Sequence, residues 1–334
     1  MKSINRFLDI DILKGILIIF VILGHSNFKY THQIYWFHMP AFFLISGFLF
    51  NLKNASLGVF VFLKKKTIAL MVPYIAFLFS FLIITFLFID DSILNVEYFF
   101  KLIFGGKLLI NQYGVFWFIT SLLFTIYLFT FLYLKIKNKK VLFLSILICF
   151  FTAHLESFLI NVKDYKIYMP LNIDTSLMAV VYFYIGFVLR IYYQAFNSKV
   201  KQFWYFSISI ALIVLVFIFL GVESFNFDMK YQSYGNLFYS LLIPVSITLA
   251  LLVLIIAVPS INFINSSLAF IGRQSLLIMY LHLLIKYILI EYNSYDLTLY
   301  LVSSIILPLI VSKVLEKNKH ASFLFLGRSY KLNK

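Results

Sequence analysis

Residues 9–26 read DIDILKGILIIFVILGHS, an apolar run that holds acidic, basic and imidazole side chains. A run of this length and composition predicts a membrane-spanning helix. Lys14 and His25 are eleven residues apart, a rotation of about 20° beyond three full helical turns. They share one face, about 16 Å apart along the axis, and Asp11 lies close to the same line. Ionisable groups inside a membrane cost about 2.5–3.5 kcal/mol each on insertion scales, so this line is the first candidate site.

The composition excludes a soluble protein. Of 334 residues, 63% are hydrophobic and 12% are charged, with a mean hydropathy of +0.97. We expect an all-α, polytopic integral membrane protein with about ten transmembrane helices, forming a single domain over 1–334 and passing repeatedly through the cell (inner or plasma) membrane. The first run lacks a small-residue cleavage site, so no cleaved signal peptide is expected. The expected spans are 8–27, 35–52, 67–89, 115–135, 139–155, 174–193, 203–222, 237–257, 268–290 and 297–315.

The basic residues predict the orientation. With the N-terminus in the cytoplasm, most of the 28 Lys and Arg residues fall in cytoplasmic segments, and most of the 13 acidic residues fall outside. Both termini are then cytoplasmic. The net charge of +15 is explained by topology, so no nucleic-acid partner is expected. The segment 92–110 is amphipathic and is expected to lie along the membrane lipid interface.

The two histidines nearest the outer face are the candidates for proton transfer. A short loop follows His25, and the next span begins near His38, so the two should approach each other. Imidazole can accept a proton near neutral pH and can act as general base toward a hydroxyl. The competing interpretation is a pair of interfacial histidines bonded to carbonyl groups. Lys14 either meets an anionic or carbonyl-bearing ligand or extends its ammonium to the cytoplasmic surface.

Two further groups of residues suit ligands on opposite sides. Basic residues on the cytoplasmic side could bind phosphates or anionic lipid, and they are Lys64, Lys65, Lys66 and Arg273. Polar and aromatic residues near outer span ends suit a sugar-binding cleft or are ordinary interfacial residues, and they are Asn111, Trp117, Asp174 and His282. No metal-spaced His or Glu pair is present in the sequence, so no metal is expected.

Several short motifs occur in a specific order. A basic residue, ten residues and a histidine are seen as Lys14 and His25. They are followed by the stretches 37–48, 62–74, 117–118 and 271–282. Together these motifs resemble the acyltransferase-3 family of integral membrane O-acyltransferases over essentially the whole chain. The stretch 170–186 most resembles the branch named for fucose 4-O-acetylase. A third basic residue that the family has just before Pro73 is replaced here by apolar residues.

The resemblance implies a membrane O-acetyltransferase that moves an acetyl group from cytoplasmic acetyl-CoA to a hydroxyl of a cell-envelope saccharide, such as capsule, O-antigen or a lipid-linked glycan. It implies that His25 is either the general base or a transient acyl carrier, a choice that stays open, with His38 beside it. Lys14 would lie near the pantetheine arm and Asp11 would orient it. The cytoplasmic basic residues would hold the CoA phosphates, and the outer group would hold the acceptor.

Two other functions fit the same residues. The line Asp11–Lys14–His25 could be the path of a proton-coupled transporter. It could also serve only to hold helices together in a membrane assembly. The sequence specifies neither the sugar nor the oligomeric state.

Overall fold

The computed structural model describes residues 7–51, 58–89, 95–161, 163, 169–198, 225–257 and 261–328, with scattered residues between 205 and 220. Across these residues the regular elements are helices, and the only β-type pairing is an isolated bridge between Asp228 and Ser233. Six helical segments are long and apolar enough to cross a membrane: Val59–Phe88, Asn111–Lys135, Lys139–Asn161, Pro170–Ile191, Leu237–Ala257 and Leu297–Glu316. The chain is therefore an all-α, polytopic membrane protein.

The first two expected spans are shorter than predicted. Helix α1 (Leu8–Gly24) has 17 residues, and α3 (His38–Phe48) has only 11, after the separate short helix α2 (Thr31–Tyr35). Pro40 explains where α3 begins, because proline lacks a backbone N–H and is favoured in the first turn of a helix, where that N–H has no intrahelical acceptor. Half of the expected span 203–222 lies outside the described residues, so the count of ten stays a prediction.

The expected span 268–290 is not one helix. Helix α12 (Asn262–Arg273) ends at the residue before Gln274, and α13 (Ser275–Glu291) continues at an angle of 76°. Counted as one broken span, this pair raises the number of candidate crossings from six to seven. The bend places Arg273 at a helix end rather than inside a continuous span.

Helix α4 (Val59–Phe88) begins earlier than expected, so the basic cluster 64–66 lies within its first turns rather than in a preceding loop. The amphipathic segment forms α5 (Val96–Phe104) and the single turn η3 (Gly106–Leu108). Val96 and Ile103 on α5 are 86% and 79% exposed, as a helix lying in a lipid interface requires.

The chain divides into two compact units, which are described separately. The first comprises 1–50, 150–164 and 181–275, and the second comprises 51–149, 165–180 and 276–334. Two of the five boundaries fall within helices α7 (Lys139–Asn161) and α8 (Thr175–Ile191).

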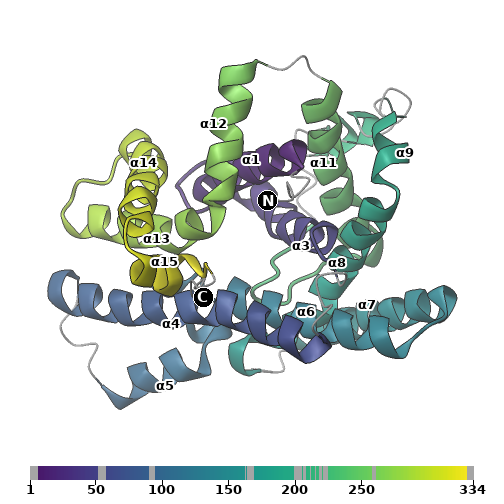
Figure 1. The fold of residues 1–334 in the computed structure, drawn as a ribbon, viewed down its shortest axis with the longest axis horizontal. Helices are drawn as coiled ribbons and strands as arrows, with labels where there is room; N and C mark the ends of the chain where they lie inside the picture. Colours follow the sequence, from purple (N-terminus) through teal and green to yellow (C-terminus); the bar gives the residue numbers. More distant parts are fainter. Residues whose placement is uncertain are drawn as a thin grey trace, which may run out of the picture. The chain divides into compact units, whose positions relative to one another are not determined.

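The first unit is built around α1, which packs most extensively on α12 (Figure 1). Glycines bring the two backbones together. A Cβ on Gly15 would lie 2.1 Å from the Leu268 carbonyl oxygen, and one on Gly272 would lie 1.9 Å from the Asp11 carbonyl oxygen. Close backbone approach at small residues is how membrane helices associate, because lipid offers no hydrophobic drive between helices. The sequence of α1 therefore fixes its partner through Gly15.

The same unit has a second close crossing, between α3 and the C-terminal part of α8. A Cβ on Gly47 would lie 1.8 Å from the Phe183 carbonyl oxygen, and one on Gly186 equally close to that of Leu44. The core between α1, α3, α9 (Tyr193–Ser198) and α11 (Leu237–Ala257) is apolar, and its buried residues include Ile10, Leu13, Leu17, Ala41, Ile45, Phe48 and Leu252.

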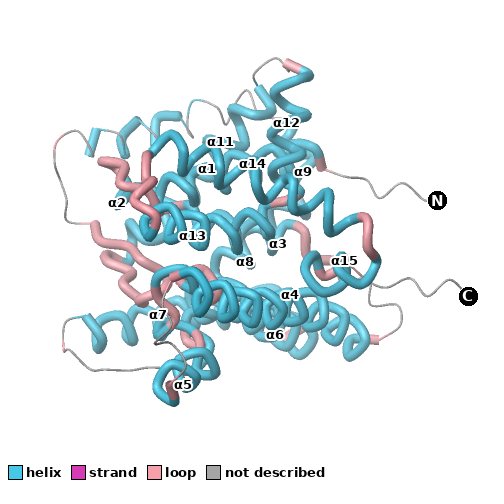
Figure 2. Tube along the Cα trace, turned by 90° about the vertical axis from the view of Figure 1, so that its left-hand side faces the viewer, coloured by secondary structure: helices cyan, strands magenta, loops and turns pink. Residues whose placement is uncertain are grey.

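In the second unit α4 packs against α6 (Trp117–Lys135) and against the C-terminal helix α15 (Lys319–Leu326), as Figure 2 shows. Helix α14 (Leu297–Glu316) also contacts α15. Pro73 interrupts α4 and has no N–H for the carbonyl of Ala69 four residues earlier. Gly327 packs at this point, where a Cβ would lie 2.2 Å from the Ala69 oxygen.

Candidate functional site

Tyr35 contacts both candidate histidines at the C-terminal end of α1. Its hydroxyl is 3.3 Å from Nδ1 of His25, and the rings are 5.8 Å apart edge to face. On the other side, the Tyr35 ring centroid is 5.3 Å from that of His38. Both histidines therefore contact the same tyrosine, which sequence reasoning did not single out. No sequence signal identifies Tyr35, because its place depends on the chain reversal before α2.

That reversal is fixed by hydroxyl groups. Ser26 donates from Oγ to the Leu23 carbonyl at 2.7 Å and accepts the N–H of Phe28 at 3.2 Å. Thr31 donates to the Phe28 carbonyl at 2.7 Å. Short polar side chains of this kind cap helix ends and form turns because they satisfy nearby backbone groups. The reversal returns the chain to the end of α1 and sets Tyr35 against His25.

His38 is almost completely buried, and its Nδ1 is 2.7 Å from the Ile34 carbonyl oxygen. A carbonyl oxygen can only accept, so Nδ1 carries the proton of this bond. In the neutral ring Nε2 is then the acceptor. His38 is therefore held in the tautomer that can take a proton at Nε2.

Helix α2 also carries two buried polar atoms without a partner among the described residues. They are the indole N–H of Trp36 and the side-chain oxygen of Gln33. Buried polar groups are normally hydrogen-bonded, and leaving one unsatisfied costs about 1–3 kcal/mol. One donor and one acceptor in this short segment are suited to a hydroxyl-bearing ligand.

A turn formed by residues 225–236 packs against α2. The rings of Trp36 and Phe225 are 5.3 Å apart. In this turn burial raises the pKa of Asp228, although the backbone N–H groups of Lys230 and Tyr231 and the charges of Lys230 and His32 oppose the shift. Burial lowers the pKa of Lys230 to about 8, against the attraction of Asp228.

In the N-terminal half of α1, Lys14 forms an ion pair with Asp11, with 3.3 Å between Nζ and Oδ1. Both side chains are largely buried, at 19% and 10% exposed. The close approach of α1 and α12 at Gly15 and Gly272 lies beside this ion pair, because Lys14 directly precedes Gly15. Arg273 follows Gly272 on the other side of the crossing, and its guanidinium lies 5.6 Å from the Phe270 ring centroid. The first unit therefore brings together Asp11, Lys14 and the end of α12.

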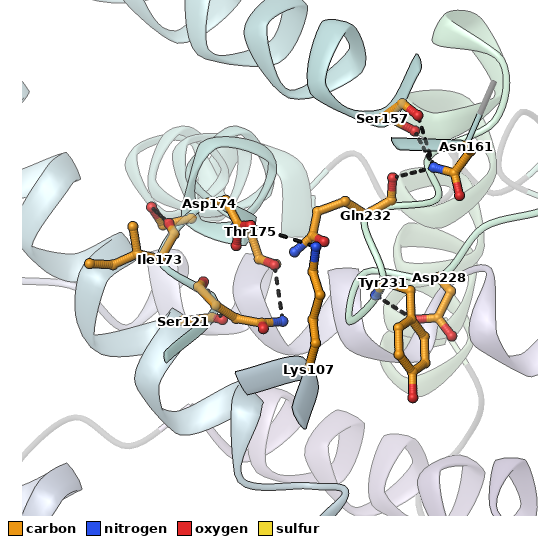
Figure 3. Close-up of polar contacts among 12 residues, drawn as sticks. Lys107, Ser121, Ser157, Asn161, Ile173, Asp174, Thr175, Asp228, Tyr231 and Gln232 are labelled. Atoms are coloured by element: carbon orange, nitrogen blue, oxygen red, sulfur yellow. Dashed lines mark hydrogen bonds and ion pairs between the residues drawn. The ribbon is translucent and has the colours of Figure 1, made fainter. Parts of the chain in front are cut away.

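Two other polar residues of this unit were not predicted as site residues. Tyr193 donates to Asp9 at 2.8 Å, and Arg190 donates to the Phe48 carbonyl at 3.0 Å. Elsewhere in the unit, Asn161 donates to the carbonyls of Gln232 and Ser157 at 3.0 and 2.9 Å (Figure 3). These hydrogen bonds connect helices α9, α8 and α7 to neighbouring segments. They also satisfy polar side chains that lie inside an otherwise apolar unit.

The remaining predicted site residues lie in the second unit. Lys64 and Lys65 are exposed on α4, and Lys66 lies 5.7 Å from the Phe62 ring centroid. Trp117 is buried at the start of α6. His282 is fully buried in α13, with Nδ1 3.1 Å from the Ile278 carbonyl oxygen.

Asp174, also in the second unit, forms a buried ion pair with Lys107, at 3.7 Å between Oδ2 and Nζ; both are drawn in Figure 3. Its other oxygen accepts the N–H of Thr175 at 2.9 Å. Lys107 was counted in the sequence only as a topological charge. Its partner is 67 positions away in the chain, and no local pattern pairs them.

No group of three or more His, Cys, Asp or Glu side chains that could hold a metal ion occurs among the residues that the structure describes.

Comparison with known proteins identifies the chain's relatives. The profile of an acyltransferase domain, Acyl_transf_3, matches residues 7–317. The nodulation protein NolL of Sinorhizobium fredii (strain NBRC 101917 / NGR234) is 47% identical over 58 residues, which are 14% of this chain and 16% of NolL. The chain thus matches only about a sixth of that relative's length. No solved structure matches. The profile covers nearly the whole chain, including α1 with Lys14 and His25, and the chain therefore belongs to the acyltransferase-3 family.

Proposed function

We propose that this membrane acyltransferase moves an acetyl group from acetyl-CoA to a hydroxyl of a cell-envelope saccharide. The observation that carries the proposal is the arrangement of His25, Tyr35 and His38 at the end of α1 in a chain of this family. Acyl transfer to a hydroxyl needs a group that takes the hydroxyl proton as the oxygen attacks. Imidazole is suited to that task near neutral pH.

The transfer proceeds as follows. His25 accepts the acceptor's O–H proton, and the oxygen bonds to the thioester carbonyl carbon. The carbon–sulfur bond breaks, and the CoA thiolate leaves and receives the proton from the imidazolium. Tyr35 orients the ring by its contact with Nδ1, so that Nε2 faces the reaction. Trp36 N–H and the Gln33 oxygen supply a donor and an acceptor for the bound hydroxyl compound.

The donor binds at the cytoplasmic end of α1 in this proposal. CoA carries phosphates, and cations in a low-dielectric setting bind them strongly. Lys14 and Arg273 flank the α1–α12 crossing, which supports a donor site there. Lys64, Lys65 and Lys66 would add phosphate contacts. The acceptor would be a capsular, O-antigen or lipid-linked glycan, and the motif in 170–186 favours an acceptor of the fucose type.

The orientation in the inner membrane is part of the proposal, with both termini and the start of α4 in the cytoplasm. Lys65→Cys in a Cys149→Ser background tests it in intact cells. We expect a membrane-impermeant maleimide to label residue 65 only after the cells are opened. Labelling of residue 65 from outside intact cells would show that the chain has the opposite orientation. The proposed donor site would then face away from the cytoplasm, where acetyl-CoA is found.

The activity is tested with purified protein in nanodiscs, acetyl-CoA labelled in the acetyl group, and a saccharide fraction from the host envelope. We expect alkali-labile label in the saccharide, and none with empty nanodiscs. A transporter would instead carry saccharide into proteoliposomes without acetylating it. Uptake without label transfer would contradict the proposal.

A further inference from the structure

The second unit contains a cavity of about 190 Å³ between the end of α4, α5, the loop 108–113 and α13. The side chains in its wall that can contact a ligand are mainly hydroxyl, amide and phenol groups, and they are Thr85, Tyr98, Asn111, Gln112, Tyr113 and Tyr287. Apolar residues with a few placed polar groups are the usual lining of a small-molecule site. The volume suits one small ring and not a nucleotide cofactor.

The polar groups form two linked sets. Gln112 donates from Nε2 to Thr85 Oγ1 at 3.0 Å, and the Thr85 hydroxyl is 3.1 Å from that of Tyr113. These three residues are at most 5% exposed. At the rim, Tyr287 donates to the amide oxygen of Asn111 at 3.2 Å. The Asn111 amide nitrogen remains a donor for a ligand.

The charge of the pocket argues for a neutral ligand. Among the described residues that line the pocket, Lys101 is the one that carries a charge, and its ammonium lies 2.6 Å from Glu97. A phosphate would meet a single cation that is already paired. Hydroxyl groups, which both donate and accept, match the amides and phenols, and the tyrosine rings offer flat apolar faces to the carbon–hydrogen face of a sugar.

The wall of the pocket is strained and held in place. Asn111 has φ 53°, a left-handed conformation that asparagine tolerates better than most residues. Gly106, at φ 60°, presses against η5 (Pro170–Asn172), where a Cβ would lie 2.4 Å from Asn172 Oδ1. Strain of this kind persists only where the surroundings fix it, and it concentrates at functional sites.

Two buried contacts supply that fixation. Lys107, next to the pocket residue Leu108, forms the ion pair with Asp174. Ser121 of α6 donates to the Asn172 carbonyl at 3.0 Å. The loop is thus held in one shape before any ligand arrives, which lowers the entropic cost of binding.

We propose that this pocket binds one pyranose unit of the saccharide, with Asn111, Gln112 and Tyr287 as its polar contacts. The assignment rests on the proposed function for the identity of the ligand as the acceptor. In it Asp174 does not touch the sugar. Asp174 positions the loop through Lys107, which changes the role expected from the sequence.

Binding is tested with methyl pyranosides of glucose, galactose, mannose, fucose and N-acetylglucosamine as probes, by saturation-transfer NMR on the full chain in nanodiscs. We expect transfer to at least one probe in the wild type. Asn111→Gly removes the amide without straining the backbone, and Tyr287→Phe removes one hydroxyl. Each should lower the signal at least fivefold.

Matched controls exist on the turn after α13. Asn293 is exposed and has φ 50°, so Asn293→Gly repeats the first substitution outside the pocket, and Tyr292→Phe repeats the second. Both should bind as the wild type does. No transfer to any probe, or equal signals in pocket and control variants, would overturn the proposal.

Acetyl transfer to the bound probe separates the two proposals. Lower binding in the pocket variants and a raised acceptor KM with unchanged kcat support the pocket as acceptor site. If the wild type acetylates a probe while the pocket variants keep its KM, the pocket assignment fails and the proposed function stands. If probes bind through the pocket but no acetyl is moved to any saccharide, the proposed function fails and the pocket remains a saccharide site.

Discussion

The Tyr35 hydroxyl lies 3.3 Å from Nδ1 of His25, although ten residues and a chain reversal separate them. The contact holds the imidazole ring at Nδ1. A ring held at one nitrogen keeps its orientation, and catalysis depends on that orientation because small displacements of a base are costly.

Tyr35→Phe is expected to lower kcat about tenfold or less, since a single neutral hydrogen bond contributes about 0.5–1.5 kcal/mol. The KM for acetyl-CoA should not change, because the proposed donor site is at the other end of α1. Steady-state kinetics measures both, and Tyr30→Phe, an exposed tyrosine in the same connection, is the control. A changed KM with an intact kcat would remove Tyr35 from the role of positioning His25.

Lys14→Ala should raise the KM for acetyl-CoA by tenfold or more, because a hydrogen bond to a charged group contributes about 1.5–3 kcal/mol. Lys65→Gln should raise it less, because Lys65 is exposed and screened. Asp174→Ala should leave donor binding intact and weaken acceptor use. Calorimetric titration of acetyl-CoA into each variant provides the check, with Lys29→Gln as control. Loss of donor binding in Asp174→Ala alone would reverse the assignment of sides.

Gly272→Ala should destabilise the first unit. The new Cβ would lie 1.9 Å from the Asp11 oxygen and 2.7 Å from the Gly15 nitrogen, and both are backbone atoms that no side-chain rotation can move. Overpacking typically costs about 1–3 kcal/mol. Thermal unfolding in nanodiscs should show a lower Tm than for Ser266→Ala, an exposed position on the same helix. Equal midpoints would mean that α1 and α12 do not cross this closely.

Lys230 should make stability depend on pH. Its pKa is about 8 in the folded protein, whereas the ordinary pKa of lysine is 10.5, so between these pH values the unfolded chain binds more protons. Stability therefore rises as the pH rises from about 8 toward 10.5. Lys230→Met should remove this part of the rise. Tm measured from pH 7.5 to 10.5 compares the two proteins, and parallel curves would contradict the prediction.

The sequence predicts the helical membrane class because apolar runs of membrane length have few other solutions. It predicts α1 and its Asp11–Lys14 pair because both follow from helical periodicity within one element. The break at Gln274 and the crossing of Gly15 with Gly272 depend on contacts between segments that are far apart in the chain. No local pattern in a single sequence predicts such contacts.

Long-range contacts also explain why the sequence does not predict two residues of the candidate sites. Tyr35 and Lys107 are unremarkable as single residues in the chain. They become site residues through a reversal fixed by Ser26 and through an ion pair with a residue far along the sequence. The start of α3 could have been predicted better, because Pro40 marks the first turn of a helix and not its middle.

The role of His25 is the central claim, and the rate of acetyl transfer by His25→Ala tests it most directly. The measurement uses protein in nanodiscs, labelled acetyl-CoA and the envelope saccharide, with His32→Ala, a histidine of the neighbouring α2, as control. Loss of a general base should lower kcat about 10²–10⁴-fold while acetyl-CoA still binds and the Tm is kept. A near-normal rate in His25→Ala would contradict the account.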